Sequence, residues 1–283
     1  MTLPNFLILG TQKAGTRWMV GMLAQHPDVF MPPYEVHYFD RADNFARGPG
    51  WYESHFADAR AQAAIGEKTP NYLLTEPHDP LERPRRIHEL LPGARLVAIL
   101  RNPVERAISG INHHLRVGYL PADVDLDDAI HRFVAEDRDY IRYGYYQRHL
   151  EAYRRFFDPA QMLTLIYEDD VVARPLPTLR RVCEFLGVEP SFGFTDLDKR
   201  VNESRMSEFS TRWARRLPIN THLAVRILSG VERVLCIRGE KRRPSDRSLD
   251  LLYDHYAADN ARLFQLLGRE VTSWARSGAH ITR

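Results

Sequence analysis

A lysine-bearing loop near the N-terminus has the composition of an anion site. It runs from Gly10 to Arg17 and reads G-T-Q-K-A-G-T-R. The backbone N–H groups of such a glycine-containing turn, and of a helix that starts after it, point toward a bound phosphate or sulfate. Lysine occurs only at positions 13, 68, 199 and 241, while arginine supplies the rest of the 39 basic residues. Because a compact ammonium and a planar guanidinium are not interchangeable at a phosphate, Lys13 in this loop is informative.

The loop differs from the Walker A loop of nucleoside triphosphatases at the decisive position. Walker A places a lysine directly after its second glycine. Here Thr16 follows Gly15, and the lysine lies earlier, at position 13. An ATP or GTP phosphate cradle is therefore disfavoured. Glycine-bearing turns are also common after the first strand of α/β proteins, so the loop alone leaves its binding role open.

A second anion contact is predicted at Arg101. This residue follows the apolar run Arg95–Leu100, and Ser109 lies eight residues later, about two helical turns into the next segment. An arginine and a hydroxyl in that arrangement could hold a second phosphate group at the rim of a sheet, where open α/β folds bind ligands. Without Lys13, a salt-bridged strand end would be the better interpretation of Arg101.

Alternating strands and helices are expected to position these residues. Three short apolar runs have the composition of buried strands: Phe6–Leu9, Arg95–Leu100 and Met162–Tyr167. Each precedes a segment with helical apolar spacing: 17–26, 104–114 and 176–186. The alternation predicts an α/β protein with a central parallel sheet flanked by helices. We expect one domain over residues 1–283, with irregular stretches at about 31–66 and 196–247.

The composition excludes a function based on overall charge. The formal net charge is only +2, from 39 basic and 37 acidic residues. A field this weak gives no reason to expect binding to nucleic acid or to a membrane surface. Any anion site must therefore be local.

The cysteines and the apolar segments predict neither a metal site nor an anchor. Cys183 and Cys236 lie far apart and match no metal-ligand spacing, so we expect two reduced thiols, with Cys183 filling the core. No apolar stretch reaches the ~18 residues of a membrane span, and the N-terminus lacks the pattern of a signal peptide. We therefore expect a cytoplasmic protein without a stable membrane anchor.

Four motifs in order resemble those of sulfotransferases that use 3′-phosphoadenosine 5′-phosphosulfate (PAPS). The resemblance is strongest to the heparan sulfate glucosaminyl 3-O-sulfotransferases and their bacterial relatives, and it covers roughly residues 5–274. The motifs are Thr11–Arg17, Glu35–Asp40, Gly66–Tyr72 and Arg101–Arg106, the last followed by Ser109. The resemblance implies a P-loop-like sulfotransferase fold. It also implies transfer of a sulfuryl group from PAPS to a hydroxyl by in-line displacement, without a metal.

On the donor side, the resemblance implies two groups of contacts. The 5′-phosphosulfate would be bound by Lys13, Ala14, Gly15, Thr16 and Arg17. The 3′-phosphate, retained in the product 3′-phosphoadenosine 5′-phosphate, would be bound by Arg101, Ser109, Lys241 and Arg243. The last two belong to an element that reads K-G-R in the family. Here Arg242 replaces its glycine, which would have allowed a close approach of the backbone.

On the acceptor side, the resemblance implies that Glu35 is the catalytic base. Removal of the hydroxyl proton by such a base contributes about 10²–10⁴-fold. Lys13 and Lys68 would stabilise the charge on the departing phosphate oxygen. His37 would orient the acceptor or Glu35, while Asp40 and Tyr145 would contact the acceptor. Spacing alone favours an ordinary loop carboxylate and a structural histidine, and only the resemblance reverses that preference.

The sequence departs from the extracellular members of the family where the acceptor would bind. Tyr34 stands where many members have a basic residue, and only Cys236 lies where those members have a disulfide-closed loop. We therefore expect the acceptor to be an alcohol of a small molecule, a lipid or a glycan. The loops at about 31–66 and 196–247 would surround it.

Two other classes of function remain as alternatives. A P-loop-type small-molecule kinase shares the strand-loop-helix start, although it needs a Walker A lysine and Mg²⁺ ligands. A non-catalytic protein that binds adenosine phosphates or anionic glycans would use the arginine-dense stretch after residue 196.

Overall fold

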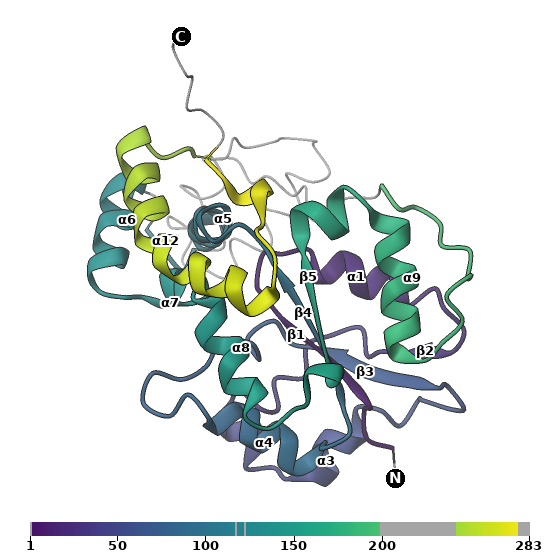
Figure 1. Ribbon diagram of the computed structural model, residues 1–283. Helices are drawn as coiled ribbons and strands as arrows, with labels where there is room; N and C mark the ends of the chain where they lie inside the picture. The colour runs from purple at the N-terminus through teal and green to yellow at the C-terminus, as the bar shows by residue number, and fades with distance from the viewer. Residues whose placement is uncertain (1, 117, 122, 199–241, 277–283) are drawn as a thin grey trace, which may run out of the picture. The chain divides into compact units, whose positions relative to one another are not determined.

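A parallel sheet forms the centre of the part of the chain that the computed structural model describes, residues 2–116, 118–121, 123–198 and 242–276. The sheet has five strands in the order β2-β3-β1-β4-β5, and every paired neighbour is parallel (Figure 1). The strands are β1 (Phe6–Gly10), β2 (Val29–Phe30), β3 (Ala64–Lys68), β4 (Arg95–Leu100) and β5 (Met162–Ile166). This is the α/β fold with a central parallel sheet that the sequence predicts.

The chain divides into two compact units. The first comprises Met1–Asn102, Tyr145–Val201 and Asp259–Arg283, and the second comprises Pro103–Gly144 and Asn202–Ala258. The whole sheet belongs to the first unit. The single-domain organisation expected from the sequence stays a prediction.

The helices are distributed over both units. Those of the first unit are α1 (Thr16–Leu23), α2 (Ala42–Phe45), α3 (Pro49–Ser54), α4 (Glu82–Leu90), α8 (Tyr146–Arg154) and α9 (Pro175–Leu186), with the short segments η1 (Pro159–Gln161), η2 (Tyr167–Val172) and η3 (Thr272–Trp274). Those of the second unit are α5 (Pro103–Arg116), α6 (Leu126–Ala135) and α7 (Asp139–Arg142). Helix α12 (Asp246–Leu267) contributes residues to both units.

Each face of the sheet has its own hydrophobic core. Successive side chains of a strand point to opposite faces. In β1, Leu7 and Leu9 pack with residues of α3, α4 and α8, whereas Phe6 and Ile8 pack with residues of α1 and α9. All four side chains are fully buried. Figure 1 shows the corresponding helices on either side of the sheet. Burial on both faces explains why the strand appears in the sequence as a continuous apolar run.

The second unit packs its helices around a buried arginine. Arg106 of α5 is fully buried, lies 5.4 Å from the centre of the Tyr143 ring and donates to the carbonyl of Tyr140. Helix α6 is capped by Asp125, whose carboxylate accepts from two backbone N–H groups of the first turn. Such a cap stabilises a helix by about 1 kcal/mol.

The three strand-helix pairs expected from the sequence are present, with small changes at their ends. Tyr167 begins η2 rather than ending β5. The stretch 31–66 is not irregular throughout, because it contains α2, α3 and the start of β3. Cys183 is buried in α9 as expected, and burial raises its pKa to about 11. Cys236 lies outside the described residues.

The close pairing of β1 with β3 generates a test of the fold. Gly66 lies opposite Phe6, and a Cβ atom added at Gly66 would come within 2.4 Å of the Phe6 ring. Because that ring is fully buried and cannot move aside, we expect Gly66→Ala to destabilise the protein by about 1–3 kcal/mol in urea unfolding.

The matched control is Gly21→Ala in α1. Nothing lies within 4 Å of a Cβ atom at that position, so the better helix propensity of alanine should stabilise by about 0.5–1 kcal/mol. Equal stabilities of the two variants would show that β1 and β3 do not pack in this register.

Candidate active site

The carboxyl ends of three neighbouring strands bring the candidate residues to one edge of the sheet. The central strands β3, β1 and β4 end at Lys68, Gly10 and Leu100. The segment that follows β3 also touches the end of β1, since the backbone N–H of Leu73 donates to the carbonyl of Leu9 at 2.8 Å. In open α/β sheets this edge is where ligands bind. The loop after β1, the residues around Lys68 and the arginine after β4 are therefore neighbours.

The loop between β1 and α1 is shaped by residues with positive φ. Lys13 has φ 71° and Gly15 has φ 80°, and α1 starts directly afterwards at Thr16. Lys13 is half-buried and Arg17 is exposed, while Ala14 and Thr16 are buried. The hydroxyl of Thr11 is buried and has no hydrogen-bond partner among the described residues. A polar atom left in this state fits a loop that takes its remaining partner from an anionic ligand.

Arg101 braces this loop from the neighbouring strand. Its Nη1 donates to the carbonyl of Lys13 at 3.0 Å, and its guanidinium lies 5.4 Å from the centre of the Tyr167 ring. Glu168 lies beside it, with Oε1 4.0 Å from Nε. Glu168 is itself held by the indole N–H of Trp274 at 2.9 Å. The guanidinium is thus fixed next to the loop, which the sequence did not predict.

A cluster of charged side chains joins the turn 35–40 to the end of β3. Lys68 Nζ donates to Glu35 Oε1, and His37 Nε2 lies 3.3 Å from Glu35 Oε2. On its other side, His37 Nδ1 lies 2.8 Å from Asp40 Oδ2. Glu35, His37, Asp40 and Lys68, all candidates from the sequence, therefore form one connected group.

The cluster fixes opposite charges on Glu35 and His37. Burial raises the pKa of the Glu35 carboxyl, but hydrogen bonds from His37 and Lys68 outweigh it and lower that pKa to about 2. Burial lowers the pKa of His37, but the hydrogen bonds to Asp40 and Glu35 outweigh it and raise that pKa to about 9. At neutral pH the site therefore holds a carboxylate between an imidazolium and an ammonium.

A further carboxylate, which was not predicted as a site residue from the sequence, lies behind this cluster. Glu67 is fully buried in β3, next to Lys68. Tyr52, Thr69 and Tyr72 each donate a hydroxyl hydrogen bond to it. The signal in the sequence is an acidic residue inside a strand of the sheet, where the other central strands are apolar.

The remaining candidates lie elsewhere in the described part of the chain. Ser109 is in α5 and the exposed Arg243 precedes α12, both in the second unit. Tyr145 is buried in the first unit, with the guanidinium of Arg148 4.4 Å from the centre of its ring. Lys241 lies outside the described residues. The roles of these four residues in binding donor or acceptor stay predictions.

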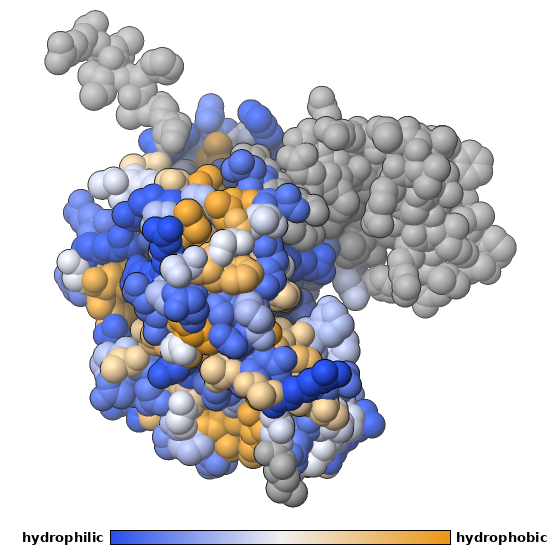
Figure 2. Space-filling view, turned by 90° about the vertical axis from the view of Figure 1, so that its right-hand side faces the viewer, coloured by the Kyte–Doolittle hydropathy of each residue, from blue (hydrophilic) through white to orange (hydrophobic). Residues whose placement is uncertain are grey.

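The hydropathy of the visible surface does not mark a ligand-binding site. Figure 2 shows hydrophilic and hydrophobic side chains interspersed over the visible face of the described residues. Among those residues, no group of His, Cys, Asp or Glu side chains is arranged to hold a metal ion. None of the described helices is long and apolar enough to cross a membrane. The candidate site is therefore identified from the contacts among its own side chains.

The chain is similar to known proteins over most of its length. The family described as "Sulfotransferase domain" matches residues 3–230. Human heparan sulfate glucosamine 3-O-sulfotransferase 6 is 31% identical over 274 residues, which cover 94% of this chain and 72% of that protein. Mouse heparan sulfate glucosamine 3-O-sulfotransferase 5 is 31% identical over 199 residues, which cover 66% of this chain. The match spans about half of that mouse protein, 54% of its length.

A solved structure supports the fold. The sulfotransferase from Alicyclobacillus acidocaldarius superimposes with a TM-score of 0.71 over 98% of this chain and 100% of that one. The two sequences are 23% identical, so this likeness concerns the fold alone.

The raised pKa of His37 predicts how stability depends on pH. A group whose pKa rises on folding, here from 6.5 to about 9, stabilises fully below pH 6.5. That contribution disappears as the pH rises through about 9. We expect a loss on the order of 2 kcal/mol across this window, measured by urea unfolding. His37→Gln should flatten the dependence, whereas His78→Gln, at an exposed position, should leave it unchanged. The same slope in His37→Gln as in the wild type would contradict the assignment.

Proposed function

The chain belongs to the sulfotransferase domain family, and from this premise we propose that it transfers the sulfuryl group of PAPS to a hydroxyl of an acceptor. The observation that carries the proposal is the connected group of Glu35, His37 and Lys68 beside a lysine-bearing loop at the same edge of the sheet. The family match also removes the reason for considering a P-loop kinase.

The donor fits the loop after β1. Its 5′-phosphosulfate takes hydrogen bonds from the backbone of Ala14–Arg17 at the start of α1 and from the ammonium of Lys13. The unsatisfied hydroxyl of Thr11 offers a further donor. On the first unit, Arg101 is the residue we assign to the 3′-phosphate. The parts that the sequence suggests for Ser109 and Arg243 of the second unit, and for Lys241, stay predictions. The product is 3′-phosphoadenosine 5′-phosphate.

The reaction needs positioning and charge stabilisation more than covalent chemistry. The acceptor oxygen forms a bond to sulfur while the bond from sulfur to the 5′-phosphate oxygen breaks, through a loose transition state like that of phosphoryl transfer. The negative charge that develops on the leaving oxygen is stabilised by the ammonium groups of Lys13 and Lys68. The acceptor proton moves to the carboxylate of Glu35.

The ion pair between Lys68 and Glu35 couples these two tasks. With a pKa of about 2, Glu35 is a weak base as long as Lys68 and His37 neutralise it. When Lys68 turns toward the leaving oxygen, Glu35 loses one of its two cationic partners and its proton affinity rises. The base is thus strengthened at the step in which the leaving group needs the ammonium.

The acceptor is an alcohol of a small molecule, a lipid or a glycan. The curated relatives named above act on heparan sulfate according to their names, which favours a glycan. Beside Glu35, however, this chain has Tyr34, 52% exposed, whose hydroxyl lies 3.0 Å from Nδ1 of His55. Burial, followed by the positive charge of Arg47, lowers the pKa of His55, so Tyr34 and His55 add no positive charge beside Glu35 at neutral pH. The cytoplasmic location expected from the sequence stays a prediction.

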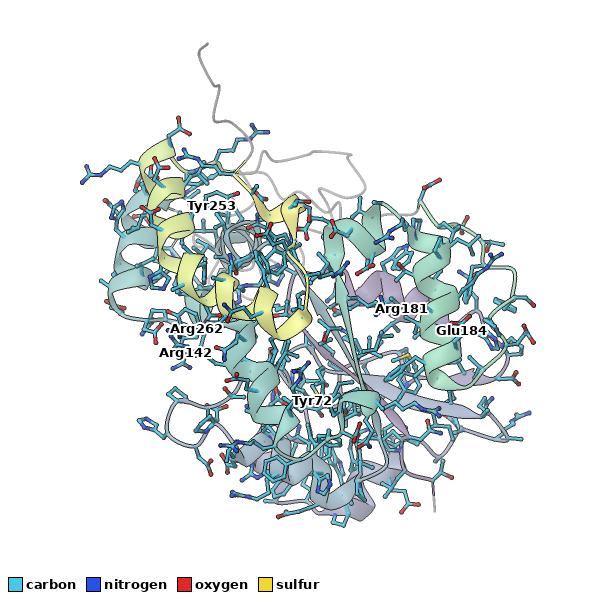
Figure 3. The ribbon with its side chains drawn as sticks, in the orientation of Figure 1. Tyr72, Arg142, Arg181, Glu184, Tyr253 and Arg262 are labelled. Carbon is cyan, nitrogen blue, oxygen red and sulfur yellow. The ribbon has the colours of Figure 1, made fainter. Side chains whose placement is uncertain are left out.

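Donor binding is tested with Lys13→Ala. We expect 3′-phosphoadenosine 5′-phosphate to bind the wild type without Mg²⁺ in isothermal titration calorimetry. Loss of a charge-assisted hydrogen bond, worth about 1.5–3 kcal/mol, should weaken binding to Lys13→Ala by about 10–100-fold. The control Arg181→Ala removes a positive charge from the exposed side of α9 and should bind normally (Figure 3). A wild type that prefers Mg-ATP would refute the proposed donor.

The catalytic base is tested with Glu35→Gln. The amide cannot accept the acceptor proton, so kcat with labelled PAPS should fall by about 10²–10⁴-fold while the affinity for 3′-phosphoadenosine 5′-phosphate persists. Glu184→Gln, an exposed carboxylate of α9, is the matched control (Figure 3). Turnover in Glu35→Gln that equals the wild type would assign the base elsewhere. Wild-type donor binding without transfer to any alcohol would instead indicate a non-catalytic binding protein.

A further inference from the structure

Glu67 is a charged group inside the core that the proposed reaction does not use. It is 0% exposed, and its side chain lies under the turn 35–40 rather than in it. Burial raises the pKa of its carboxyl, while hydrogen bonds from Tyr72, Thr69 and Tyr52 oppose that rise. Burying a carboxylate costs free energy even when it is hydrogen-bonded, and an apolar residue at this strand position would avoid the cost. A contribution to stability therefore does not explain why a glutamate occupies this position.

In all three side-chain hydrogen bonds around Glu67, the partner hydroxyl donates and the carboxylate accepts. Tyr52 donates to Oε1 at 3.0 Å and Tyr72 donates to Oε1 at 2.7 Å, while Thr69 donates to Oε2 at 2.8 Å. Burial raises the pKa values of Tyr52 and Tyr72 well above their usual range, so both remain hydroxyls. Because each hydroxyl proton points at Glu67, the oxygen lone pairs of these groups face away from it.

Those lone pairs accept hydrogen bonds from backbone N–H groups of the turn that carries Glu35, the proposed base. Thr69 Oγ1 accepts from the N–H of His37 at 3.3 Å. Tyr72 Oη accepts from the N–H of Tyr38 at 2.9 Å and from that of Phe39 at 3.4 Å. Figure 3 shows Tyr72 between the sheet and the helices on its α4 and α8 side. One buried carboxylate thus orients two hydroxyls, which together hold three consecutive backbone N–H groups.

The turn needs such support because its backbone is strained. His37 has φ 57°, in the left-handed region that a residue with a Cβ atom keeps only where its surroundings hold it. On the opposite side, Asn44 donates to the carbonyls of Val36 at 3.3 Å and of His37 at 3.1 Å. The turn is therefore held through its N–H groups by the segment that follows β3 and through its carbonyls by α2. Its conformation places Glu35 against both Lys68 and His37.

We propose that Glu67 is a positioning residue, which acts through Thr69 and Tyr72 to fix the turn 36–39 so that Glu35 faces the acceptor hydroxyl. The carboxylate touches neither substrate and works by polarising two hydroxyls toward itself, which makes them acceptors for the turn. The inference rests on the proposed function only for its effect on turnover. Its effect on the backbone of the turn is independent of any activity.

The first test is the pair Thr69→Val and Thr69→Ser. Valine keeps the shape and loses the hydroxyl, so kcat should fall by about 10–100-fold, as expected for a displaced base. Affinity for 3′-phosphoadenosine 5′-phosphate should remain. Serine keeps the hydroxyl and should restore kcat to within about threefold of the wild type. In hydrogen-exchange NMR, the amide of His37 should lose protection in Thr69→Val and retain it in Thr69→Ser.

The second test is Glu67→Gln. The side-chain NH₂ of glutamine donates, so the hydroxyl that faces it must turn its proton elsewhere and is no longer oriented as an acceptor for the turn. We expect faster exchange of the amides of His37, Tyr38 and Phe39, together with a loss of kcat that matches Thr69→Val. The control Tyr256→Phe removes another buried hydroxyl bond, from Tyr256 to the carbonyl of Ile141 in the second unit, and should lower stability without changing kcat or these amides.

The outcomes separate the two proposals. A wild type without transfer activity refutes the proposed function, while the amide exchange still decides whether Glu67 fixes the turn. Protected amides and a kcat within about twofold of the wild type, in both Thr69→Val and Glu67→Gln, would overturn the positioning role. Equal losses of kcat in Thr69→Val and Thr69→Ser would overturn it as well, since the hydroxyl would not matter.

Discussion

The parallel pairing of β1 with β3 and β4 is the constraint on which the site depends. Three central strands that run in the same direction end at the same edge of the sheet. Each of them is followed by polar residues, while the strands themselves are buried on both faces. The lysine-bearing loop, Lys68 and Arg101 are therefore brought together by backbone register, although Lys13 and Arg101 are 88 positions apart in the sequence. Side-chain contacts then refine this arrangement.

Much of the sheet could be predicted because β1, β4 and β5 consist mostly of apolar residues and appear in the sequence as short apolar runs. Strand β3 could not, since Ala64-Ile65-Gly66-Glu67-Lys68 has no such run. Its central glycine makes room for the Phe6 ring, and its two charged residues are buried by contacts with other segments. The polar residues of such a strand find their hydrogen-bond partners in other segments, so the strand has no apolar pattern by which it can be recognised in the sequence.

The same reason limits what the sequence reveals of the site. Glu35, His37, Asp40 and Lys68 were predicted from motifs, and the structure shows that they touch. The motifs could not show that Arg101 also binds the carbonyl of Lys13, because that contact joins two strands distant in sequence. Nor could they show that Glu67 lies beneath the turn, since the hydroxyls around it come from α3 and from the segment after β3. A sequence motif shows which reactive residue types lie near one another in the chain. It does not show which distant segments come into contact on folding.

The hydrogen bond from Arg101 to the carbonyl of Lys13 has a thermodynamic consequence. A loop with positive φ at Lys13 and Gly15 would sample many conformations if nothing held it. Here a guanidinium anchored beside Tyr167 and Glu168 limits that freedom before any nucleotide arrives. Association then requires little ordering of the main chain, so most of the entropy loss falls on the nucleotide itself. Because the loop does not have to change its conformation first, we expect the association rate constant of the nucleotide to be high.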